Sequence, residues 1–226
     1  MKRYEFSLQY PKPLNNDQVK PLIDVAKSGL FSRYSSDLVV DVESKLAKYY
    51  GTKYAVTCAS GTGALHGVLT ALDFSPGSEI IMTSVADIGI VLPVIYENLI
   101  PVFADLDKET YNIDPNSVEE KITNKTKAVI AVHLAGSPSD LNQLKIICDK
   151  MGLVLIEDFS QAHGAEYKEK KVGSIGLISY GSFQQSKQIT SGEGGVIVTN
   201  DKSLADRALI GVDKGWERQR PLEERM

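Results

Sequence analysis

Short apolar runs alternate with segments of helical periodicity along the middle of the chain. Residues 61–73, for example, carry Leu65, Val68, Leu69 and Leu72 at the spacing of one helix face. Continuous apolar strands that alternate with helices are typical of a mostly parallel sheet with helices on both faces. The pattern therefore predicts an α/β fold of three layers. The predicted strands are residues 54–58, 79–83, 100–104, 128–133 and 153–156, and two further helices are predicted, one ending at Asn98 and one over 141–151.

The two ends of the chain depart from this alternation. The apolar runs 177–183 and 196–199 have no long helix between them, so we expect a hairpin-like or mixed part of the sheet there. The N-terminal part has helical character, with Asp37 as a candidate helix cap. The predicted organisation is an N-terminal helical segment (1–50), a large domain (51–212) and the start of a C-terminal region that the chain lacks (213–226).

Composition narrows the classes of protein to consider. The 226 residues suffice for one large domain, and the net charge of −4 without a basic block argues against a nucleic-acid partner. No apolar stretch approaches the ~20 residues that span a bilayer, and the N-terminus does not resemble a signal peptide. Cys58 and Cys148 are expected to be free thiols in the reducing cytoplasm. His66, His133 and His163 lack metal-ligand spacing, so no metal is predicted.

Lys187 is the first candidate for chemistry. It lies in a loop rich in hydroxyl groups and glycines, residues 182–195, although most lysines are solvated surface charges. Upstream, the strand 153–156 leads into Glu157 and Asp158. A lysine in such a loop and a carboxylate at a strand end suit a cofactor that forms a Schiff base and carries a ring nitrogen needing a counter-charge. The pair predicts pyridoxal 5'-phosphate (PLP).

Asp158 and Gln161 follow that strand, where ligands of open α/β sheets bind. An ionised Asp158 would keep the ring nitrogen protonated, and Gln161 would donate to the phenolic oxygen of the ring. The competing interpretation is local, with Asp158 capping a turn and Gln161 at the surface. The presence of Lys187 favours the cofactor interpretation.

A phosphate site is predicted where residues 59–64 join a strand to a helix, because small residues let backbone N–H groups approach an anion at a helix N-terminus. An alternative is a dinucleotide fingerprint formed by Gly61, Gly63 and Gly67. Its last glycine is one position too far along the chain, and the next strand ends in Thr83 without an acidic residue for a ribose. A plain helix start is the third explanation.

Taken together, these motifs resemble the DegT/DnrJ/StrS-type sugar aminotransferase family, over about Gly29 to Asp213. The resemblance implies the large domain of the fold type I PLP-dependent transferases, a mostly parallel mixed sheet in three layers. It also implies a homodimer with sites at the subunit interface. The matching segments are Ser60-Gly61-Thr62-x-Ala64-Leu65, Pro101-Val102-Phe103-x-Asp105-x-Asp107, Glu157-Asp158-x-x-Gln161-Ala162-x-Gly164-Ala165, Gly173-Ser174-x-Gly176, Ser182-Phe183-x-x-Ser186-Lys187 and Gly192-Glu193-Gly194-Gly195.

The resemblance also implies a role for each residue. Lys187 would form the internal aldimine and later move a proton, Asp158 would pair with the ring nitrogen, and Gln161 would contact the oxygen side of the ring. A few relatives have histidine at the lysine position and carry out dehydration, so lysine implies amino transfer. The donor would be glutamate or glutamine, and the acceptor a keto-sugar, nucleotide-linked in the first instance, or a related cyclitol ketone. The implied phosphate ligands are Gly61, Thr62 and Ser182.

The chain departs from the family pattern in three places. The family has an aromatic residue over the ring after the strand 79–83, whereas here we expect Asp87 to face the ring or the substrate. Gly181 stands where the family tends to have phenylalanine, and relatives continue for roughly another domain beyond residue 226. Two alternatives to the aminotransferase therefore stay open, a truncated PLP-binding remnant without turnover and a nicotinamide-dependent Rossmann enzyme.

Overall fold

The computed structural model describes residues 13–218 and divides the chain into two compact units, residues 1–42 and 43–226. In the first unit, α1 (Asn16–Ser28) begins with a reciprocal cap between Asn15 and Gln18 and ends at Gly29, which has φ of 68°. The next helix, α2 (Leu38–Tyr50), crosses into the second unit. The predicted N-terminal helical segment therefore holds two helices, and its first twelve residues lie outside the described part, as do residues 219–226 of the predicted C-terminal segment. The domain boundaries after residues 50 and 212 stay predictions.

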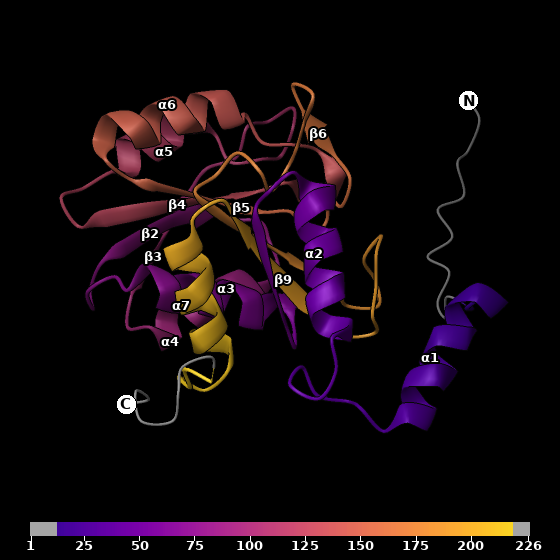
Figure 1. The fold of residues 1–226 in the computed structure, drawn as a ribbon. Helices are drawn as coiled ribbons and strands as arrows, with labels where there is room; N and C mark the ends of the chain where they lie inside the picture. The colour runs from indigo at the N-terminus through magenta and orange to yellow at the C-terminus, as the bar shows by residue number, and fades with distance from the viewer. Residues whose placement is uncertain (1–12, 219–226) are drawn as a thin grey trace, which may run out of the picture. The chain divides into compact units, whose positions relative to one another are not determined.

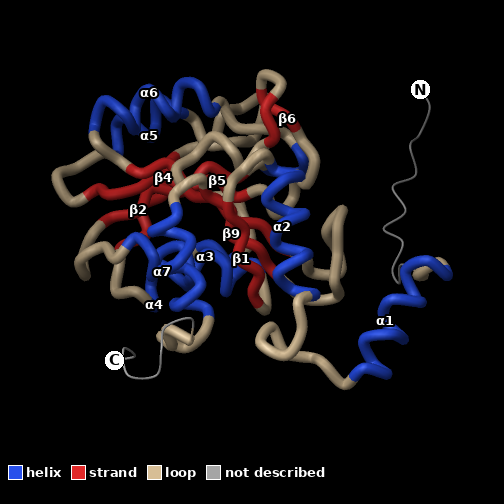
Figure 2. Tube along the Cα trace, in the orientation of Figure 1, coloured by secondary structure: helices blue, strands red, loops and turns tan. Residues whose placement is uncertain are grey.

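Within the described residues, seven strands form one sheet in the order β1-β9-β8-β5-β4-β2-β3 (Figures 1 and 2). All of them run in the same direction except β9, which pairs antiparallel with both β1 and β8. The mixed part of the sheet predicted near the C-terminal runs is thus confirmed. The bounds are β1 (Tyr54–Cys58), β2 (Glu79–Thr83), β3 (Ile100–Ala104), β4 (Thr126–Val132), β5 (Val154–Asp158), β8 (Ile178–Ser182) and β9 (Gly195–Thr199), with a separate hairpin of β6 (Glu166–Tyr167) and β7 (Lys170–Lys171).

Helices cover both faces of this sheet (Figure 1). One face carries α3 (Gly61–Leu72), α4 (Leu92–Tyr96) and α7 (Lys202–Val212), and the other carries α5 (Pro115–Lys121) and α6 (Leu141–Met151). Among residues 13–218, every helix is too short or too polar to cross a bilayer.

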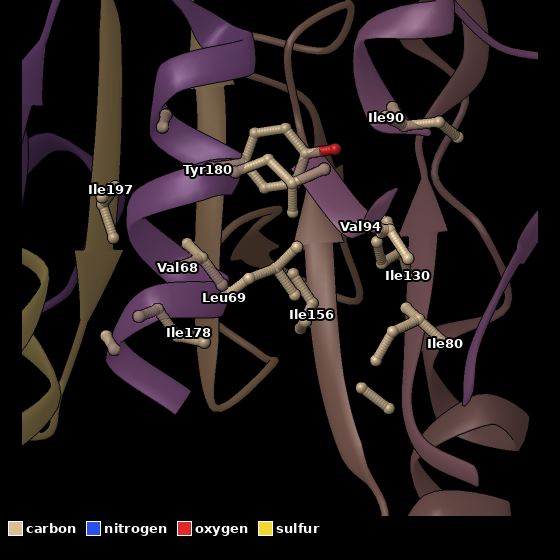
Figure 3. Packing of buried hydrophobic residues seen from close by; sticks show 14 of the residues in the cluster. Val68, Leu69, Ile80, Ile90, Val94, Ile130, Ile156, Ile178, Tyr180 and Ile197 are labelled. Atoms are coloured by element: carbon tan, nitrogen blue, oxygen red, sulfur yellow. The ribbon is translucent and has the colours of Figure 1, made fainter. Parts of the chain in front are cut away.

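The pleat of the strands sorts their side chains into two buried clusters. Ile130, Ile156 and Ile197 pack in the cluster under α3, shown in Figure 3, whereas their neighbours Val129 and Leu155 belong to the cluster under α6. Burying a side chain of this size contributes about 1.5–3 kcal/mol. Because both faces are buried, the strands have the continuous apolar sequences from which they were predicted.

The segment after β2 differs from the single helix expected up to Asn98. It contains a 3₁₀ turn, η1 (Ile88–Ile90), followed by the short helix α4. Asp87 caps η1 by accepting the N–H of Gly89 at 2.7 Å, and Pro93 lies in the first turn of α4, where a missing N–H is tolerated. The interruption leaves Asp87 outside a regular helix, at the end of the loop that follows β2.

Phe159, directly after β5, fills the space beside Gly181. The ring is fully buried and lies 4.5 Å from the ring of Tyr50, measured between centroids. A Cβ atom added to Gly181 would overlap Cε2 of this ring, and one added to Gly173 would lie 2.7 Å from Cδ1. The ring of Phe159 therefore explains the glycine at position 181.

We predict that Gly181→Ala destabilises the protein by about 1–3 kcal/mol, because the added methyl group meets the Phe159 ring in a closely packed core. The same substitution in a Phe159→Ala background should cost less, because the ring is gone. Urea unfolding of the wild type, the two single variants and the double variant measures this coupling. Additive effects of the two substitutions would contradict the packing explanation.

Candidate active site

A pocket of about 330 Å³ opens at the edge of the sheet where β1, β2, β5 and β8 have their carboxyl ends. This is the edge at which open α/β sheets bind ligands. The structure brings all seven residues that the sequence singled out into the lining of this one pocket, namely Gly61, Thr62, Asp87, Asp158, Gln161, Ser182 and Lys187. The described residues include no group of three or more histidine, cysteine or acidic side chains arranged to hold a metal.

The N-terminus of α3 supplies the part of the pocket where the sequence predicts an anion site. Ser60 caps this helix through its Oγ, which accepts the N–H of Gly63 at 2.9 Å, while its carbonyl accepts the N–H of Ala64 at 2.8 Å. The N–H groups of Gly61 and Thr62 precede these bonds in the first turn, where a helix offers them no partner of its own. Together with the helix dipole they suit a phosphate group.

Glycines keep this anion site compact. A Cβ atom on Gly61 would lie 2.6 Å from Cβ of Ser182, and one on Gly195 would overlap the carbonyl of Ser60. The start of β9 and the end of β8 thus lie so close to the first turn of α3 that Gly61 and Gly195 have no room for a side chain. A Cβ atom on Gly89 would lie 2.6 Å from Oγ1 of Thr62, so this glycine leaves space for the threonine hydroxyl.

Asp158 ends β5 and turns its carboxylate toward the α3 side of the sheet. Only 5% of the residue is exposed. Its Oδ1 accepts the N–H of Ser160 at 2.8 Å, and its Oδ2 accepts the hydroxyl of Tyr180 at 2.8 Å. Both donors are also lining residues of the pocket. The bond to Ser160 is the local turn cap considered from the sequence, and it coexists with a place in the pocket.

Glu157, the residue before Asp158, turns to the opposite face of the sheet and is completely buried. Burial alone would raise its pKa, but hydrogen bonds from His133, Gly176 and Gly173 outweigh burial and hold the pKa of Glu157 below its ordinary value. Its two oxygens accept bonds from three backbone N–H groups, an imidazole and a hydroxyl, those of Gly173, Ile175, Gly176, His133 and Ser179.

The hydrogen bonds of His133 fix its tautomer. Its Nδ1 accepts the backbone N–H of Ser139 at 3.0 Å, so Nδ1 carries no proton. The proton lies on Nε2, which donates to Oε2 of Glu157 at 3.1 Å. The pair is therefore a neutral imidazole beside a carboxylate, and it ties the end of β4 to β5.

Gln161 is oriented by its neighbours. Its Oε1 accepts the backbone N–H of Ala135 at 2.9 Å, and its own carbonyl accepts Nε2 of Gln188 at 2.6 Å. Because a backbone N–H only donates, the side-chain oxygen is committed and the amide NH₂ is the group left for a ligand. The donor role of Gln161 toward a cofactor stays a prediction.

Lys187 lies in the loop between β8 and β9. Its backbone N–H donates to the carbonyl of Gln184 at 2.9 Å, and Gln184 in turn accepts the N–H of Ser186 through Oε1 at 2.7 Å. The return of the loop uses Gly192, whose φ of 86° favours glycine. Gln188 joins the same loop to the Gln161 segment. This bond connects two segments that line the pocket, the one that contains Gln161 and the loop that carries Lys187.

His163, to which the sequence assigned no role, holds the backbone next to the predicted anion site. Nε2 of His163 donates to the carbonyl of Ser182 at 2.7 Å, so its Nδ1 accepts the hydroxyl of Tyr50 at 2.6 Å. Burial lowers the pKa of His163, and the positive charge of Lys187 acts in the same direction. The imidazole also stacks on Phe183, with centroids 5.3 Å apart. His163 thus fixes the backbone at Ser182.

Sequence reasoning also missed Tyr180 and Ser160, the two partners of Asp158. Tyr180 lies within an apolar strand, where an aromatic residue is expected to be core. The available signal was its alternation with Ser182, which places both hydroxyl-bearing side chains on one face of β8. Ser160 acts through its backbone N–H, which no residue type reveals.

A model of the DegT/DnrJ/EryC1/StrS aminotransferase family matches residues 13–225 of the chain. The chain belongs to this family. The GDP-perosamine synthase of Escherichia coli O157:H7 is 45% identical over 167 residues, which are 74% of this chain and 46% of that protein. The L-glutamine:2-deoxy-scyllo-inosose aminotransferase of Streptomyces kanamyceticus is 44% identical over 163 residues, 72% of this chain and 38% of that protein. The chain spans about half the length of the curated relatives it matches.

Solved structures of similar proteins share the fold. The Escherichia coli GDP-4-keto-6-deoxy-D-mannose-3-dehydratase, solved with bound hydrated PLP, superimposes with a TM-score of 0.87 and 31% identity over 93% of this chain and 55% of that one. The predicted fold class, the large domain of fold type I PLP-dependent transferases, is therefore confirmed. Membership of the family gives no support to the dinucleotide-binding alternative.

We predict that the buried Glu157 makes the stability of the protein decrease at acidic pH. Its pKa is depressed in the folded state, so its contribution is present above the unfolded value of about 4.3 and is lost as pH falls through the folded value. Glu157→Gln should lower the free energy of unfolding by on the order of 3 kcal/mol at pH 7, because the hydrogen-bond donors around position 157 would no longer face a negative charge. The unfolding free energy of this variant should fall less steeply below pH 5 than that of the wild type.

The control is Glu119→Gln, because Glu119 forms an exposed ion pair with Lys150. Exposed pairs of this kind contribute about 0–1 kcal/mol. Urea unfolding at pH 7 and at lower pH compares the three proteins. A Glu157→Gln variant as stable as the Glu119→Gln variant would contradict the structural role of the buried carboxylate.

Proposed function

We propose that this chain binds PLP and transfers an amino group from glutamate or glutamine to a keto-sugar, nucleotide-linked, or to a related cyclitol ketone. The observation that carries the proposal is the convergence of Lys187, Asp158, Gln161 and the first turn of α3 on one pocket. Each of these supplies a different group that PLP needs, and they come from three separate parts of the chain. A homodimer, a cytoplasmic location and the domain boundaries accompany the proposal as predictions.

The residues fit PLP by their chemistry. The N–H groups of Gly61 and Thr62, the threonine hydroxyl and the hydroxyl of Ser182 would bind the phosphate. Asp158 would hold a proton on the ring nitrogen, and the NH₂ of Gln161 would donate to the ring oxygen. When bound, PLP supplies an aldehyde for amines and a ring that withdraws electrons. The structurally similar GDP-4-keto-6-deoxy-D-mannose-3-dehydratase of Escherichia coli was solved with hydrated PLP bound.

Lys187 is the residue proposed to attach the cofactor and to move the proton. Lys187 lines the pocket and lies on the loop between Ser182 and Gly195, and its side chain ends in an amine. Lys187 would hold the cofactor through this amine, and the same amine, when free, would serve as the base that moves the proton. Amino transfer rather than dehydration is proposed because this position holds lysine.

The names of relatives support the class of acceptor. One relative is named for GDP-perosamine synthesis and another for amino transfer from glutamine to 2-deoxy-scyllo-inosose. Asp87 lines the pocket where the family pattern has an aromatic residue, and we propose that it faces the ring or an amino group of a substrate. Among the described residues, the aromatic residue in the lining of the pocket is Tyr180. Its hydroxyl donates to Asp158, and it does not come from the segment after β2 where the family pattern has its aromatic residue.

We predict that borohydride reduction of the PLP-loaded protein fixes the cofactor to Lys187. The peptide that carries the label is identified by mass spectrometry. Lys187→Ala should lose the label, whereas Lys202→Ala, which changes a lysine paired with Asp206 on the surface of α7, should keep it. Equal labelling of the wild type and Lys187→Ala would refute the assignment.

A turnover measurement separates the enzyme from the alternative of a PLP-binding remnant. Glutamate or glutamine added to the loaded protein should convert the aldehyde form of the cofactor to its amine form, which absorbance follows. A keto-sugar nucleotide should then reverse the change. Stable cofactor binding without either conversion would favour the remnant.

We predict that Asp158→Asn slows this half-reaction on the order of 10²-fold or more, because asparagine keeps the shape but loses the charge for the ring nitrogen. Asp140→Asn is the matched control, since Asp140 also accepts a tyrosine hydroxyl, that of Tyr167 at 2.8 Å, but lies outside the pocket. The control should react like the wild type. A near-wild-type rate in Asp158→Asn would exclude the proposed role.

A further inference from the structure

We infer that Tyr180 is a positioning residue, which holds the Asp158 carboxylate in the orientation that a pyridine-type ring nitrogen requires. The inference rests on the proposed function, because it concerns the ring of PLP. It adds a residue that acts through Asp158 and leaves the roles of the other pocket residues unchanged.

The sheet places the two residues opposite each other. Asp158 and Tyr180 are Cα partners in the parallel pair β5–β8, so their side chains leave the same face of the sheet. The residues before them on that face, Ile156 and Ile178, are also close neighbours in the core, as Figure 3 shows. The register that packs the two isoleucines therefore also brings the hydroxyl of Tyr180 to 2.8 Å from Oδ2 of Asp158.

The environment of Tyr180 keeps its hydroxyl protonated and donating. The side chain is among the largest that are fully buried, with 2% of the residue exposed. Burial raises the pKa of Tyr180 well above its ordinary value, and the negative charges of Asp158 and Asp87 raise it further. A hydroxyl that stays protonated is a permanent donor to the carboxylate across the working range of pH.

Two donors together fix the plane of the carboxylate. Tyr180 holds Oδ2 and the backbone N–H of Ser160 holds Oδ1, each at 2.8 Å, so rotation about the Cβ–Cγ bond would break both bonds. An ionised carboxylate accepts about four hydrogen bonds, which leaves acceptor positions on Asp158 for the pocket. One donor comes from the turn after β5 and the other from the next strand, so neither alone sets the orientation.

The hydroxyl is the part of Tyr180 that a purely apolar role would not need. The ring packs in the cluster of Ile156 and Ile178, a task that phenylalanine would perform with the same volume. The two roles are therefore separable by Tyr180→Phe, which keeps the ring and removes the donor. Other ionisable groups that act near this pair are Asp87, whose charge acts on Tyr180, and His163, on which the charges of Asp158 and Lys187 act. The substitution leaves all of them in place.

The test uses pyridoxamine 5'-phosphate and its 1-deaza analogue, in which carbon replaces the ring nitrogen. Neither ligand bonds covalently to Lys187, so dissociation constants from calorimetry report contacts alone. Tyr180→Phe should weaken pyridoxamine 5'-phosphate on the order of tenfold, the effect of about one hydrogen bond to a charged group. The deaza analogue should change by less than about twofold, because it makes no ring-nitrogen contact to lose.

Tyr167→Phe is the matched control, since its hydroxyl donates to Asp140 at the same distance of 2.8 Å outside the pocket. It should leave both dissociation constants unchanged. Thermal unfolding of each variant confirms that the protein is folded. Equal weakening of both ligands by Tyr180→Phe would show a structural role only and overturn the inference.

A second comparison removes dependence on a single variant. In an Asp158→Asn background, adding Tyr180→Phe should cost little further affinity, because the hydroxyl acts through the carboxylate. An additional loss as large as in the wild-type background would also overturn the inference. If the wild type binds neither ligand, the proposed function fails, and this result is distinguishable because it needs no variant.

Discussion

Two neighbouring carboxylates at the end of β5 point to opposite faces of the sheet, and much of the site depends on this division. Successive side chains of a strand alternate between faces, so Glu157 and Asp158 cannot share one environment. Glu157 enters the α6 side, where it is fully buried, and Asp158 enters the α3 side, where it lines the pocket. One acidic dipeptide thus supplies a structural anchor, Glu157, and a carboxylate in the lining of the pocket, Asp158.

The anchor reaches the pocket through the chain that follows. The N–H groups at Gly173, Ile175 and Gly176 that surround Glu157 belong to the turn that leads into β8. β8 then carries Tyr180 and Ser182 and passes into the loop with Lys187. Fixing that turn therefore helps to set the start of β8 and, through it, the positions of Tyr180 and Ser182. His163 holds the far end of β8 at the Ser182 carbonyl.

The sequence revealed those features that depend on local pattern. The strands were predictable because both faces of the sheet are apolar, and the pocket residues were predictable because parallel strands end at a common edge. Contacts between distant segments were not. Two examples are the Phe159 ring in the space beside Gly181 and the hydrogen bond from Tyr180 to Asp158. Both can be predicted only when the register of β5 against β8 is known. The break between η1 and α4 was missed because the apolar positions there suit one longer helix.

The place of β9 in the sheet has a consequence for the order of assembly. Among the described strands, β1 comes first in the chain and β9 last, yet β1 has β9 as its neighbour in the sheet. Tyr54 is paired with Thr199, a contact of long sequence separation, and such contacts form slowly because a large loop must close first. In the folded sheet β9 lies between β1 and β8, and so joins the strand before the Ser60 turn to the strand before the loop that carries Lys187. The proposed cofactor, which would contact both the turn and the loop, would therefore be a ligand of the finished sheet, and its binding would shift the folding equilibrium toward the native state.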